Sequence, residues 1–261
     1  MAQGRSLDEG DLKRHARQIV LPEIGGTGQE RLLSASVLVI GAGGLGSPML
    51  LYLAAAGVGR IGVVDFDRVD ESNLQRQIAF STDDIGRKKV EAVRDRIRAL
   101  DPRILLEVHD LRLDAGNVAS LIAGYDVIAD GCDDLATRLC VHDAAMAAGK
   151  PLVSGAVQGL DGQLATYKAY LGPPHPCMRC LMSEEPGGDG LPTCAQGGIL
   201  GAAAGVMGSL QAVEVIKELL GKESLSGRMM HYDAMSCDLV SMRLPRRTAC
   251  DGSCRAPQGR W

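Results

Sequence analysis

The fold is most clearly indicated by one segment near the N-terminus, Val37-Leu38-Val39-Ile40-Gly41-Ala42-Gly43-Gly44-Leu45-Gly46. An apolar, β-forming run leads directly into a glycine-rich turn, and residues 47–56 after the turn favour a helix. A second apolar run, residues 61–64, ends at Asp65. Strand, glycine turn, helix, strand and acid together form the pattern of a nucleotide-binding βαβ unit.

Each part of this pattern has a physical role. Glycine permits the tight turn, lets the backbone approach a phosphate and lets the helix pack on the strand. Amide groups at the helix N-terminus would face the phosphates, where the helix dipole also favours negative charge. The carboxylate of Asp65 is placed to accept hydrogen bonds from a ribose. The glycines predicted to contact the nucleotide are Gly41, Gly43, Gly44 and Gly46.

The segment after Asp65 favours a triphosphate. Polar and basic residues follow this acid closely, and Gly86-Arg87-Lys88-Lys89 opens the next predicted helix. A dehydrogenase binds a diphosphate largely with backbone groups, whereas a triphosphate that loses pyrophosphate needs cations on its leaving group. ATP chemistry is therefore favoured over an NAD-dependent oxidoreductase, which only the glycine turn and Asp65 support. The further candidate nucleotide-binding residues here are Asp67, Ser72, Asn73, Leu74, Gln75, Arg76 and Lys89.

The composition is that of one large α/β domain. The chain has 261 residues, of which 46% are hydrophobic, enough for a substantial core. Only 3% are aromatic, so Val, Leu, Ile and Ala must fill that core. The formal net charge of −4 gives no indication of binding to nucleic acid or to an acidic membrane surface.

We expect a cytoplasmic protein without a membrane span. The first residues lack the apolar run of a signal peptide. The apolar stretch at residues 199–210 is followed by Gln211 and Glu214, before it reaches the roughly 18 residues that would span a bilayer. We therefore predict a buried helix over residues 199–220, whose small residues would allow close packing in the core or at an interface.

Strand and helix signals alternate through most of the chain. This alternation predicts a Rossmann-like, doubly wound parallel sheet covered on both faces, with antiparallel additions in the C-terminal half. We expect a single domain over residues 1–261, with a nucleotide-binding half at about 30–150 and a second half at about 151–261. The predicted strands span residues 37–40, 61–64, 104–108, 125–129, 151–157, 163–170, 228–232 and 239–243. The predicted helices span residues 29–33, 47–56, 87–100, 117–122, 137–147 and 199–220, with a loop at residues 25–28.

Eight cysteines in a chain without a signal peptide favour metal or thiol chemistry over a disulfide framework. Two short-spaced pairs, Cys177 with Cys180 and Cys250 with Cys254, could close a tetrahedral thiolate site around zinc. Four sulfur ligands leave no open position, so such a site would be structural. The alternatives are unrelated thiols, or a site in which His175 replaces one sulfur.

The roles of several other residues have more than one interpretation. Cys194 stands alone between glycine-rich segments, as either a thiol for acyl or sulfur transfer or a small loop residue. Asp133 follows the fourth predicted strand, where ligands bind in open α/β sheets. Its carboxylate would suit the Mg²⁺ carried by ATP, but Asp133 or Asp134 would also serve as a helix N-cap. Arg17, taken alone, is typical of a solvated helix residue.

Taken together, these residues resemble those of the MoeB/ThiF/HesA family, bacterial relatives of the ubiquitin-activating enzymes. The resemblance runs from about Leu12 to Cys254 and includes Asp65-Phe66-Asp67, Thr193-Cys194 and Tyr232-Asp233-Ala234-Met235 besides the glycine turn and the Cys-x-x-Cys pair. It implies an enzyme that uses ATP and Mg²⁺ to adenylate the C-terminal glycine of a small ubiquitin-like sulfur-carrier protein. The product would enter thiocarboxylate formation for molybdopterin or thiamin biosynthesis.

The resemblance also implies roles for individual residues. Gly44 and Asp65 would bind the nucleotide, and Arg17 would reach the ATP site of the partner subunit in a homodimer. Cys194 matches the family's loop cysteine. The implied catalytic residues are Arg17, Arg76, Lys89, Asp133 and Cys194, with Ser72 and Asn73 beside the phosphates, and the implied zinc ligands are Cys177, Cys180, Cys250 and Cys254.

Two departures from the family pattern are visible. Asp134 replaces the asparagine that commonly follows the magnesium-binding aspartate, and Cys250 and Cys254 are one residue further apart than usual. No rhodanese-like sequence follows Cys254, so we expect a separate sulfur donor, a rhodanese or a cysteine desulfurase. A non-catalytic adaptor is a further hypothesis, which the intact Arg76, Lys89 and Asp133 disfavour.

Overall fold

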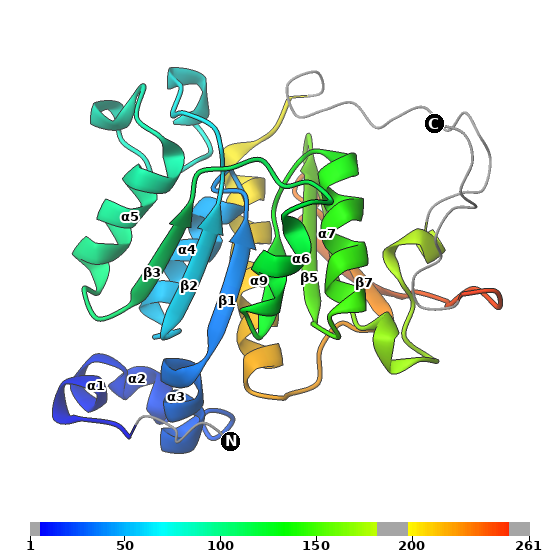
Figure 1. Cartoon of the computed structure of the whole chain (residues 1–261), viewed down its shortest axis with the longest axis horizontal. Coiled ribbons are helices and arrows are strands. Elements are labelled where there is room, and N and C mark those ends of the chain that lie inside the picture. Colours follow the sequence, from blue (N-terminus) through cyan, green and yellow to red (C-terminus); the bar gives the residue numbers. More distant parts are fainter. Residues whose placement is uncertain (1–5, 182–197, 251–261) are drawn as a thin grey trace.

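The fold is built on one eight-stranded sheet (Figure 1). The computed structural model describes residues 6–181 and 198–250. The strand order is β3-β2-β1-β4-β5-β6-β7-β8, with parallel pairing as far as β5 and antiparallel pairing beyond it. This confirms the predicted α/β sheet with antiparallel C-terminal additions. The strands are β1 (Ser36–Ile40), β2 (Arg60–Val64), β3 (Leu105–His109), β4 (Val127–Asp130), β5 (Leu152–Gln158), β6 (Asp161–Tyr167), β7 (Arg228–Asp233) and β8 (Asp238–Arg243).

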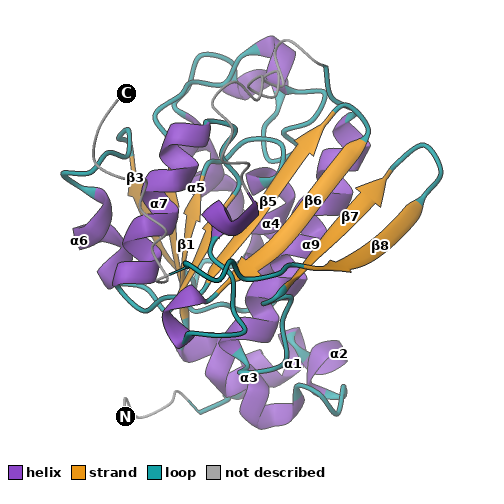
Figure 2. Ribbon diagram, turned by 90° about the vertical axis from the view of Figure 1, so that its right-hand side faces the viewer, coloured by secondary structure: helices purple, strands orange, loops and turns teal. Residues whose placement is uncertain are grey.

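Helices cover both faces of the sheet (Figure 2). Leu50 of α4, Val93 of α5 and Met207 of α9 belong to one buried cluster. Ile122 of α6 and Val141 of α7 belong to a second cluster on the other face. Alternate residues of β1 join the two clusters, which explains why this strand is apolar throughout. The helices are α1 (Glu9–Arg14), α2 (Ala16–Ile19), α3 (Gly25–Ser34), α4 (Gly46–Ala55), α5 (Lys89–Leu100), α6 (Val118–Ala123), α7 (Leu135–Ala147) and α9 (Gly201–Leu219).

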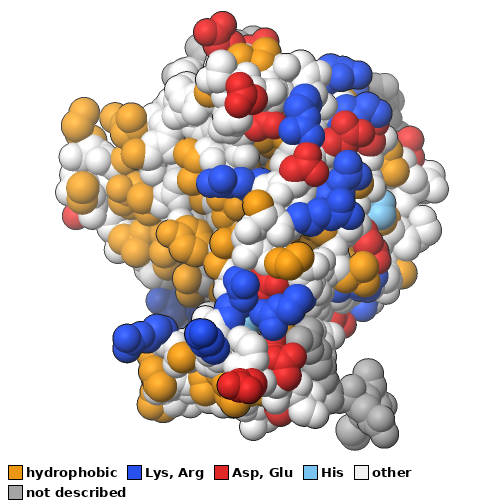
Figure 3. Space-filling model, turned by 90° about the vertical axis from the view of Figure 1, so that its left-hand side faces the viewer, with side chains coloured by type: hydrophobic (Ala, Val, Ile, Leu, Met, Phe, Trp, Pro, Cys, Tyr) orange, Lys and Arg blue, Asp and Glu red, His pale blue; other side chains and the backbone are white. Residues whose placement is uncertain are grey.

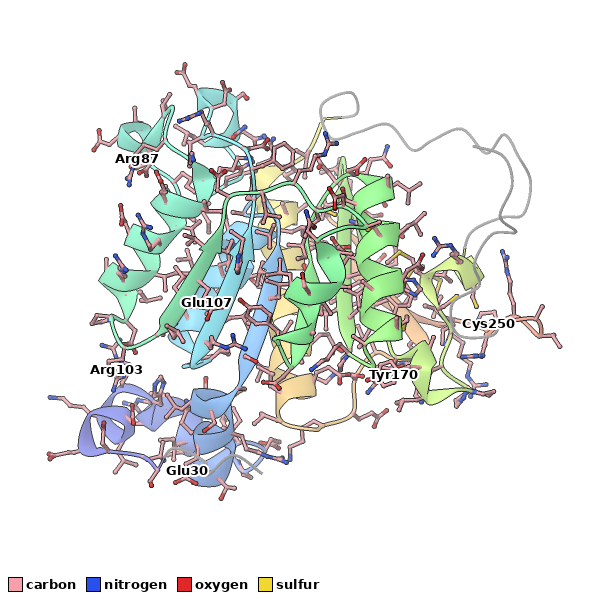
Figure 4. The ribbon with its side chains drawn as sticks, in the orientation of Figure 1. Glu30, Arg87, Arg103, Glu107, Tyr170 and Cys250 are labelled. Carbon is pink, nitrogen blue, oxygen red and sulfur yellow. The ribbon has the colours of Figure 1, made fainter. Side chains whose placement is uncertain are left out.

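The helices α1, α2 and α3 lie at the amino ends of the parallel strands (Figure 1). The side-chain amides of Gln18 and Gln29 each donate a hydrogen bond to the carbonyl oxygen of Ala56, at 3.0 Å. The guanidinium of Arg103, which precedes β3, donates to the buried carboxylate of Asp11 at 2.7 Å (Figure 4). These contacts fix the N-terminal helices to the end of the sheet opposite the glycine turn.

The predicted loop at residues 25–28 is wrong, because α3 is helical from Gly25. Gly28 packs so closely that a Cβ there would lie 3.1 Å from Cγ2 of Ile24 and 3.3 Å from Cδ2 of Leu220. Burial of this turn against α9 outweighs the low helix propensity of glycine. The other predicted bounds agree with the observed elements to within a few residues.

The helix α9 was predicted to be buried, and this is correct for only one of its faces. Ala204, Met207 and Gln211 are fully buried, whereas Val206 is 38% and Val213 is 53% exposed. In the described part of the chain, no helix is long and apolar enough to cross a membrane.

The register of the central strands places the first residues of three loops, those after β1, β2 and β4, side by side. Ile40, the last residue of β1, pairs with Val64 of β2 and with Asp130 of β4. The amide of Gly41 donates to the carbonyl of Val64 at 2.8 Å, and the amide of Gly131 donates to that of Ile40 at 3.0 Å. The loops that follow β1, β2 and β4 therefore begin at the same level of the sheet.

Candidate functional site

The glycine turn is closed tightly against the loop that follows β4. Gly41 has a φ of 88°, a conformation that favours glycine. A Cβ at Gly46 would lie only 1.9 Å from the carbonyl oxygen of Gly41. Within α4, the amide of Ser47 already donates to the carbonyl of Gly43 at 2.8 Å and Pro48 has no N–H group, so the amides that could face a phosphate are those of the turn itself, residues 43–46. The tight turn that the sequence predicts is present, and its role in binding phosphate stays a prediction.

Asp65 fastens the glycine turn to the end of β2. Its Oδ2 accepts a hydrogen bond from the amide of Ala42, and its Oδ1 accepts one from the amide of Asp67, both at 2.8 Å. Burial raises the pKa of this carboxyl, although the ammonium of Lys89 and the two amides act in the opposite direction. Each oxygen keeps acceptor capacity for a hydroxyl group, as a ribose-binding acid requires.

Lys89 is a buried lysine at the start of α5. It is 5% exposed, and its Nζ forms an ion pair with Oδ2 of Asp67 at 2.9 Å. Asp67 is half exposed, so the pair lies at the boundary between the core and the solvent. The adjacent Lys88 is more exposed and pairs with Asp110 instead. Of these two lysines, only Lys89 therefore lies beside Asp65.

The predicted phosphate-binding segment is organised by Asp70, which the sequence analysis missed. Asp70 caps a short 3₁₀ helix, Glu71–Asn73, and its Oδ1 accepts a hydrogen bond from the hydroxyl of Ser72 at 2.6 Å. The side chain of Asn73 accepts from the amide of Asp70 at 3.2 Å, which completes a capping box. Asp70 and Asn73 are three residues apart, a capping-box spacing that could have identified this turn.

This segment lies against both the glycine turn and α9. The Cγ and Cδ atoms of Arg76 would lie 3.5 Å from a Cβ at Gly44. A Cβ at Gly201, the first residue of α9, would lie 2.1 Å from the carbonyl oxygen of Gln75. Leu74 packs against the buried cluster beneath. The structure thus brings Arg76 to the glycine turn, while Leu74 contributes packing.

The loop between β4 and α7 resolves the alternatives for its two aspartates. Asp134 is the N-cap of α7, and its Oδ2 accepts hydrogen bonds from the amide of Thr137 at 2.8 Å and from its hydroxyl at 2.6 Å. Asp133 is exposed and forms no side-chain hydrogen bond or ion pair with any residue that the structure describes. The capping role belongs to Asp134, which leaves the carboxylate of Asp133 available for a ligand.

A buried polar network lies beneath this loop. Asp130 is fully buried, and its Oδ2 accepts from the hydroxyl of Ser154 at 2.7 Å and lies 3.3 Å from Nε of Arg138. Arg138 also donates to the carbonyl oxygens of Cys132 at 2.6 Å and of Gly155 at 2.9 Å. Burial and the neighbouring carboxylate of Asp130 raise the pKa of the Cys132 thiol, which is therefore a packing group and not a nucleophile. The network fixes the backbone that presents Asp133.

Replacing Asp134 by Ala should lower the free energy of unfolding by about 1 kcal/mol, because α7 loses its N-cap. The hydrogen bonds from Thr137 lower the pKa of Asp134, so this stabilisation is present at neutral pH and is lost as the pH falls through the folded-state pKa. Denaturant unfolding at neutral and acidic pH would measure the difference from the unsubstituted protein. Asp133→Ala is the matched control, and equal destabilisation by both substitutions would contradict the assignment of the cap.

Three of the four predicted metal ligands converge. The ligand atoms of Cys177, Cys180 and Cys250 all lie within 4.8 Å of one another, and the sulfurs of Cys177 and Cys180 are 3.6 Å apart. Zinc–sulfur bonds of about 2.3 Å in a tetrahedron would place two sulfurs about 3.8 Å apart, so the spacing fits zinc. His175 is not part of this group, because neither of its ring nitrogens lies within 4.8 Å of all three sulfurs. Its Nδ1 lies 2.7 Å from the hydroxyl of Ser226 instead.

Further contacts hold the segment that contains Cys250. The amide of Arg247 donates to the sulfur of Cys180 at 3.5 Å, and the guanidinium of Arg246 donates to the carbonyl of Cys250 at 2.8 Å. Cys250 lies on the opposite side of the molecule from Arg87, the residue two positions before Lys89 (Figure 4). The cysteine cluster is thus remote from the start of α5. Cys254 and Cys194 lie outside the described residues.

Arg17 is not brought to the other predicted site residues of its own chain. It is exposed on α2, at the amino ends of the strands, whereas the glycine turn lies at their carboxyl ends (Figure 1). A five-residue strand such as β1 separates these two levels by about 16 Å. The described geometry therefore leaves no role for Arg17 in the site of its own chain.

The chain is similar to known proteins along most of its length. The model of the ThiF family matches residues 15–254. The chain is 43% identical to the sulfur carrier protein adenylyltransferase of Thermus thermophilus, over 92% of this chain and 90% of that protein. It is 44% identical to the SAMP-activating enzyme E1 of Haloferax volcanii, over 94% and 89% of the two chains.

Longer proteins and more distant structures are also similar. The chain is 46% identical to the probable adenylyltransferase/sulfurtransferase MoeZ of Mycobacterium tuberculosis, and the match covers 88% of this chain but only 59% of MoeZ. A crystal structure of E. coli MccB with MccA-N7isoASN superposes with a TM-score of 0.79 at 19% identity, over 95% of this chain and 83% of that one. At this identity the superposition supports the fold alone.

Proposed function

The chain belongs to the ThiF family, and we propose that it uses ATP to adenylate the C-terminal glycine of a ubiquitin-like sulfur-carrier protein. The observation that carries the proposal is the arrangement at the ends of β1, β2 and β4 of the glycine turn, the buried Lys89 and Asp133, whose carboxylate has no partner among the described residues. Relatives of 43–46% identity named adenylyltransferases support it.

In the proposed reaction, the carboxylate of the carrier's terminal glycine attacks the α-phosphorus of ATP. A bond forms between a carboxylate oxygen and the α-phosphorus. The bond from the α-phosphorus to the oxygen that bridges to the β-phosphate breaks, and pyrophosphate leaves. The amides of the glycine turn and the cations of Arg76 and Lys89 would stabilise the phosphate charge, which is largest on the leaving group. Asp65 would orient the ribose. No protein nucleophile is needed for this step.

Two metals fit the residues that are present. Asp133 offers Mg²⁺ the hard oxygen ligand that it prefers, and the ion would neutralise charge on the phosphates of ATP. Both hydrogen bonds from Thr137 go to Oδ2 of Asp134 and hold this carboxylate at the start of α7, so we propose Asp133 as the ligand and Asp134 as an added negative charge beside the ion. The soft thiolate set of Cys177, Cys180 and Cys250 suits zinc, and we propose Cys254 as the fourth ligand.

The proposed partners follow from the same assignment. We propose that the second half of the chain, residues 151–261, binds the carrier and zinc, and that residues 30–150 bind ATP. A homodimer would bring Arg17 of one subunit to the ATP of the other. A separate sulfur donor, a rhodanese or a cysteine desulfurase, would supply sulfur as a persulfide. The terminal sulfur would attack the acyl-adenylate, directly or after transfer of the acyl group to Cys194, and AMP would leave. A second thiol would then cleave the S–S bond of the acyl disulfide, forming a new disulfide and leaving the thiocarboxylate. The pathway would be molybdopterin or thiamin biosynthesis.

Pyrophosphate release tests the proposed function. The purified protein should release pyrophosphate when ATP, Mg²⁺ and a carrier ending in Gly-Gly are all present, and should not do so with a carrier that lacks its last glycine. None of the relatives reported above is named an oxidoreductase, and NAD is the matched negative control for binding. Tight binding of NAD without any pyrophosphate release across several carriers would overturn the proposal.

The purified protein should also contain about one zinc per chain, measured by metal analysis after purification without chelators. Cys180→Ser should lower both the zinc content and the melting temperature, because it removes one ligand that links residues 177–180 to residues 246–250. Cys140→Ser, a half-buried cysteine of α7 outside the cluster, should leave the zinc content unchanged. Protein without zinc would refute this part of the proposal.

A further inference from the structure

Two consecutive residues of α7 hold the two residues that lie between Cys177 and Cys180. The Nε2 atom of His142 accepts a hydrogen bond from the backbone amide of Met178 at 3.1 Å. The carboxylate of Asp143 forms an ion pair with the guanidinium of Arg179. The segment that we call the cysteine turn, residues 177–180, is therefore attached to α7 at both of its central positions.

The surroundings of His142 fix its orientation and its tautomer. The imidazole is fully buried, and its edge meets the ring of Tyr167 at a centroid distance of 5.8 Å. Because Nε2 accepts the amide of Met178, it carries no proton, and the proton of the neutral ring lies on Nδ1. Nδ1 then donates to Oδ1 of Asp143 at 3.0 Å. Every polar atom of the ring has a partner.

Asp143 completes the arrangement. Burial raises the pKa of its carboxyl, but the hydrogen bonds from His142 and Arg179 outweigh burial, and the pKa is lowered overall. Its side chain is one-third exposed, whereas that of His142 is not exposed at all. The carboxylate thus links the imidazole to the cysteine turn, and neither residue contacts the glycine turn or the loop that contains Asp133.

We propose that His142, supported by Asp143, is a positioning residue for a zinc ion bound by the cysteine turn. A fixed amide at Met178 sets the path of the backbone between the two cysteines, and so keeps their sulfurs close to the spacing that tetrahedral zinc requires. The proposal rests on the zinc site proposed above. It adds two residues that do not touch the metal but determine how tightly it is bound.

Zinc affinity in competition with a chromogenic chelator tests the proposal, and it needs neither ATP nor a carrier. His142→Ala should weaken zinc binding about 10- to 100-fold, the usual effect of removing a partner that orients the ligands. His142→Gln should restore most of the affinity, because its amide oxygen can accept from Met178. Cobalt-substituted His142→Ala should also show altered sulfur-to-cobalt charge-transfer bands, which a general loss of stability would not produce in the folded fraction.

Two further variants complete the experiment. His175→Ala removes another histidine of the same region, one that contacts Ser226 and not the cysteine turn, and should leave zinc affinity unchanged. If His142→Ala does not fold, Asp143→Ala is the milder test, and weaker zinc binding is again expected. Zinc affinity equal to that of the unsubstituted protein in a folded His142→Ala or Asp143→Ala variant would overturn the positioning role. Absence of zinc from the unsubstituted protein would instead refute the metal site itself.

Discussion

Lys89→Met should slow carrier-dependent pyrophosphate release about 100- to 1,000-fold, the range found when one preorganised group that stabilises transition-state charge is removed. Methionine preserves the apolar stem that lies in the core but removes the ammonium. Asp67, the partner of Lys89, is half exposed, so water can solvate its carboxylate and the fold should persist. The measurement is pyrophosphate release at saturating ATP, with a thermal melt to confirm folding.

Lys88→Met is the matched control for this prediction. Lys88 is the preceding residue, but its side chain is 37% exposed and pairs with Asp110. Acidic and basic side chains lie close together on the face of the molecule that Figure 3 shows, and salt screens an exposed charge such as that of Lys88. We expect a change of less than about threefold, the size usual for an exposed ion pair. Equal rates for the two variants would show that Lys89 does not act on the leaving group.

Much of this fold could be predicted because its signals are local. The run from Val37 to Gly46 contains a strand, a turn that requires glycine and a helix start, and the observed φ of Gly41 agrees with that requirement. The spacing of Cys177 and Cys180 is equally local. The loop predicted at residues 25–28 failed for the opposite reason, because contacts with Leu220, remote in the sequence, make this segment helical.

The supporting residues of the site could not be predicted in the same way. Asp133 and Asp134 were equally suitable as N-caps, and only the contacts with Thr137 distinguish them. Arg138 is a typical surface residue in the sequence, yet it lies beneath the loop of Asp133 because β5 brings Gly155 beside it. His142 meets Met178 across 36 residues of sequence. Such pairs depend on the packing of α7, which no short pattern encodes.

Arg17→Ala and Asp133→Ala should each be nearly inactive, yet regain activity when they are mixed and allowed to exchange subunits. Arg17 lies at the end of the sheet opposite its own glycine turn, so we propose that it acts on the site of a partner. A hybrid dimer then contains one site with both residues intact. Random assortment of a 1:1 mixture makes half of the dimers hybrid, so about a quarter of the normal activity is expected. Lys13→Ala, an exposed substitution on α1, should remain active.

The double variant provides the reciprocal test. A chain carrying both Arg17→Ala and Asp133→Ala supplies neither residue, so every hybrid with an unsubstituted chain has two defective sites. Mixing equal amounts should therefore reduce the activity of the unsubstituted protein by about half after subunit exchange. If Arg17 acted within its own chain, the single variants would not complement each other and the double variant would leave the unsubstituted protein fully active. Mass measurement would show that hybrids have formed, so an unchanged activity in their presence would mean that Arg17 acts within its own chain. An arginine that acts on developing charge across a dimer interface changes turnover in the hybrids alone.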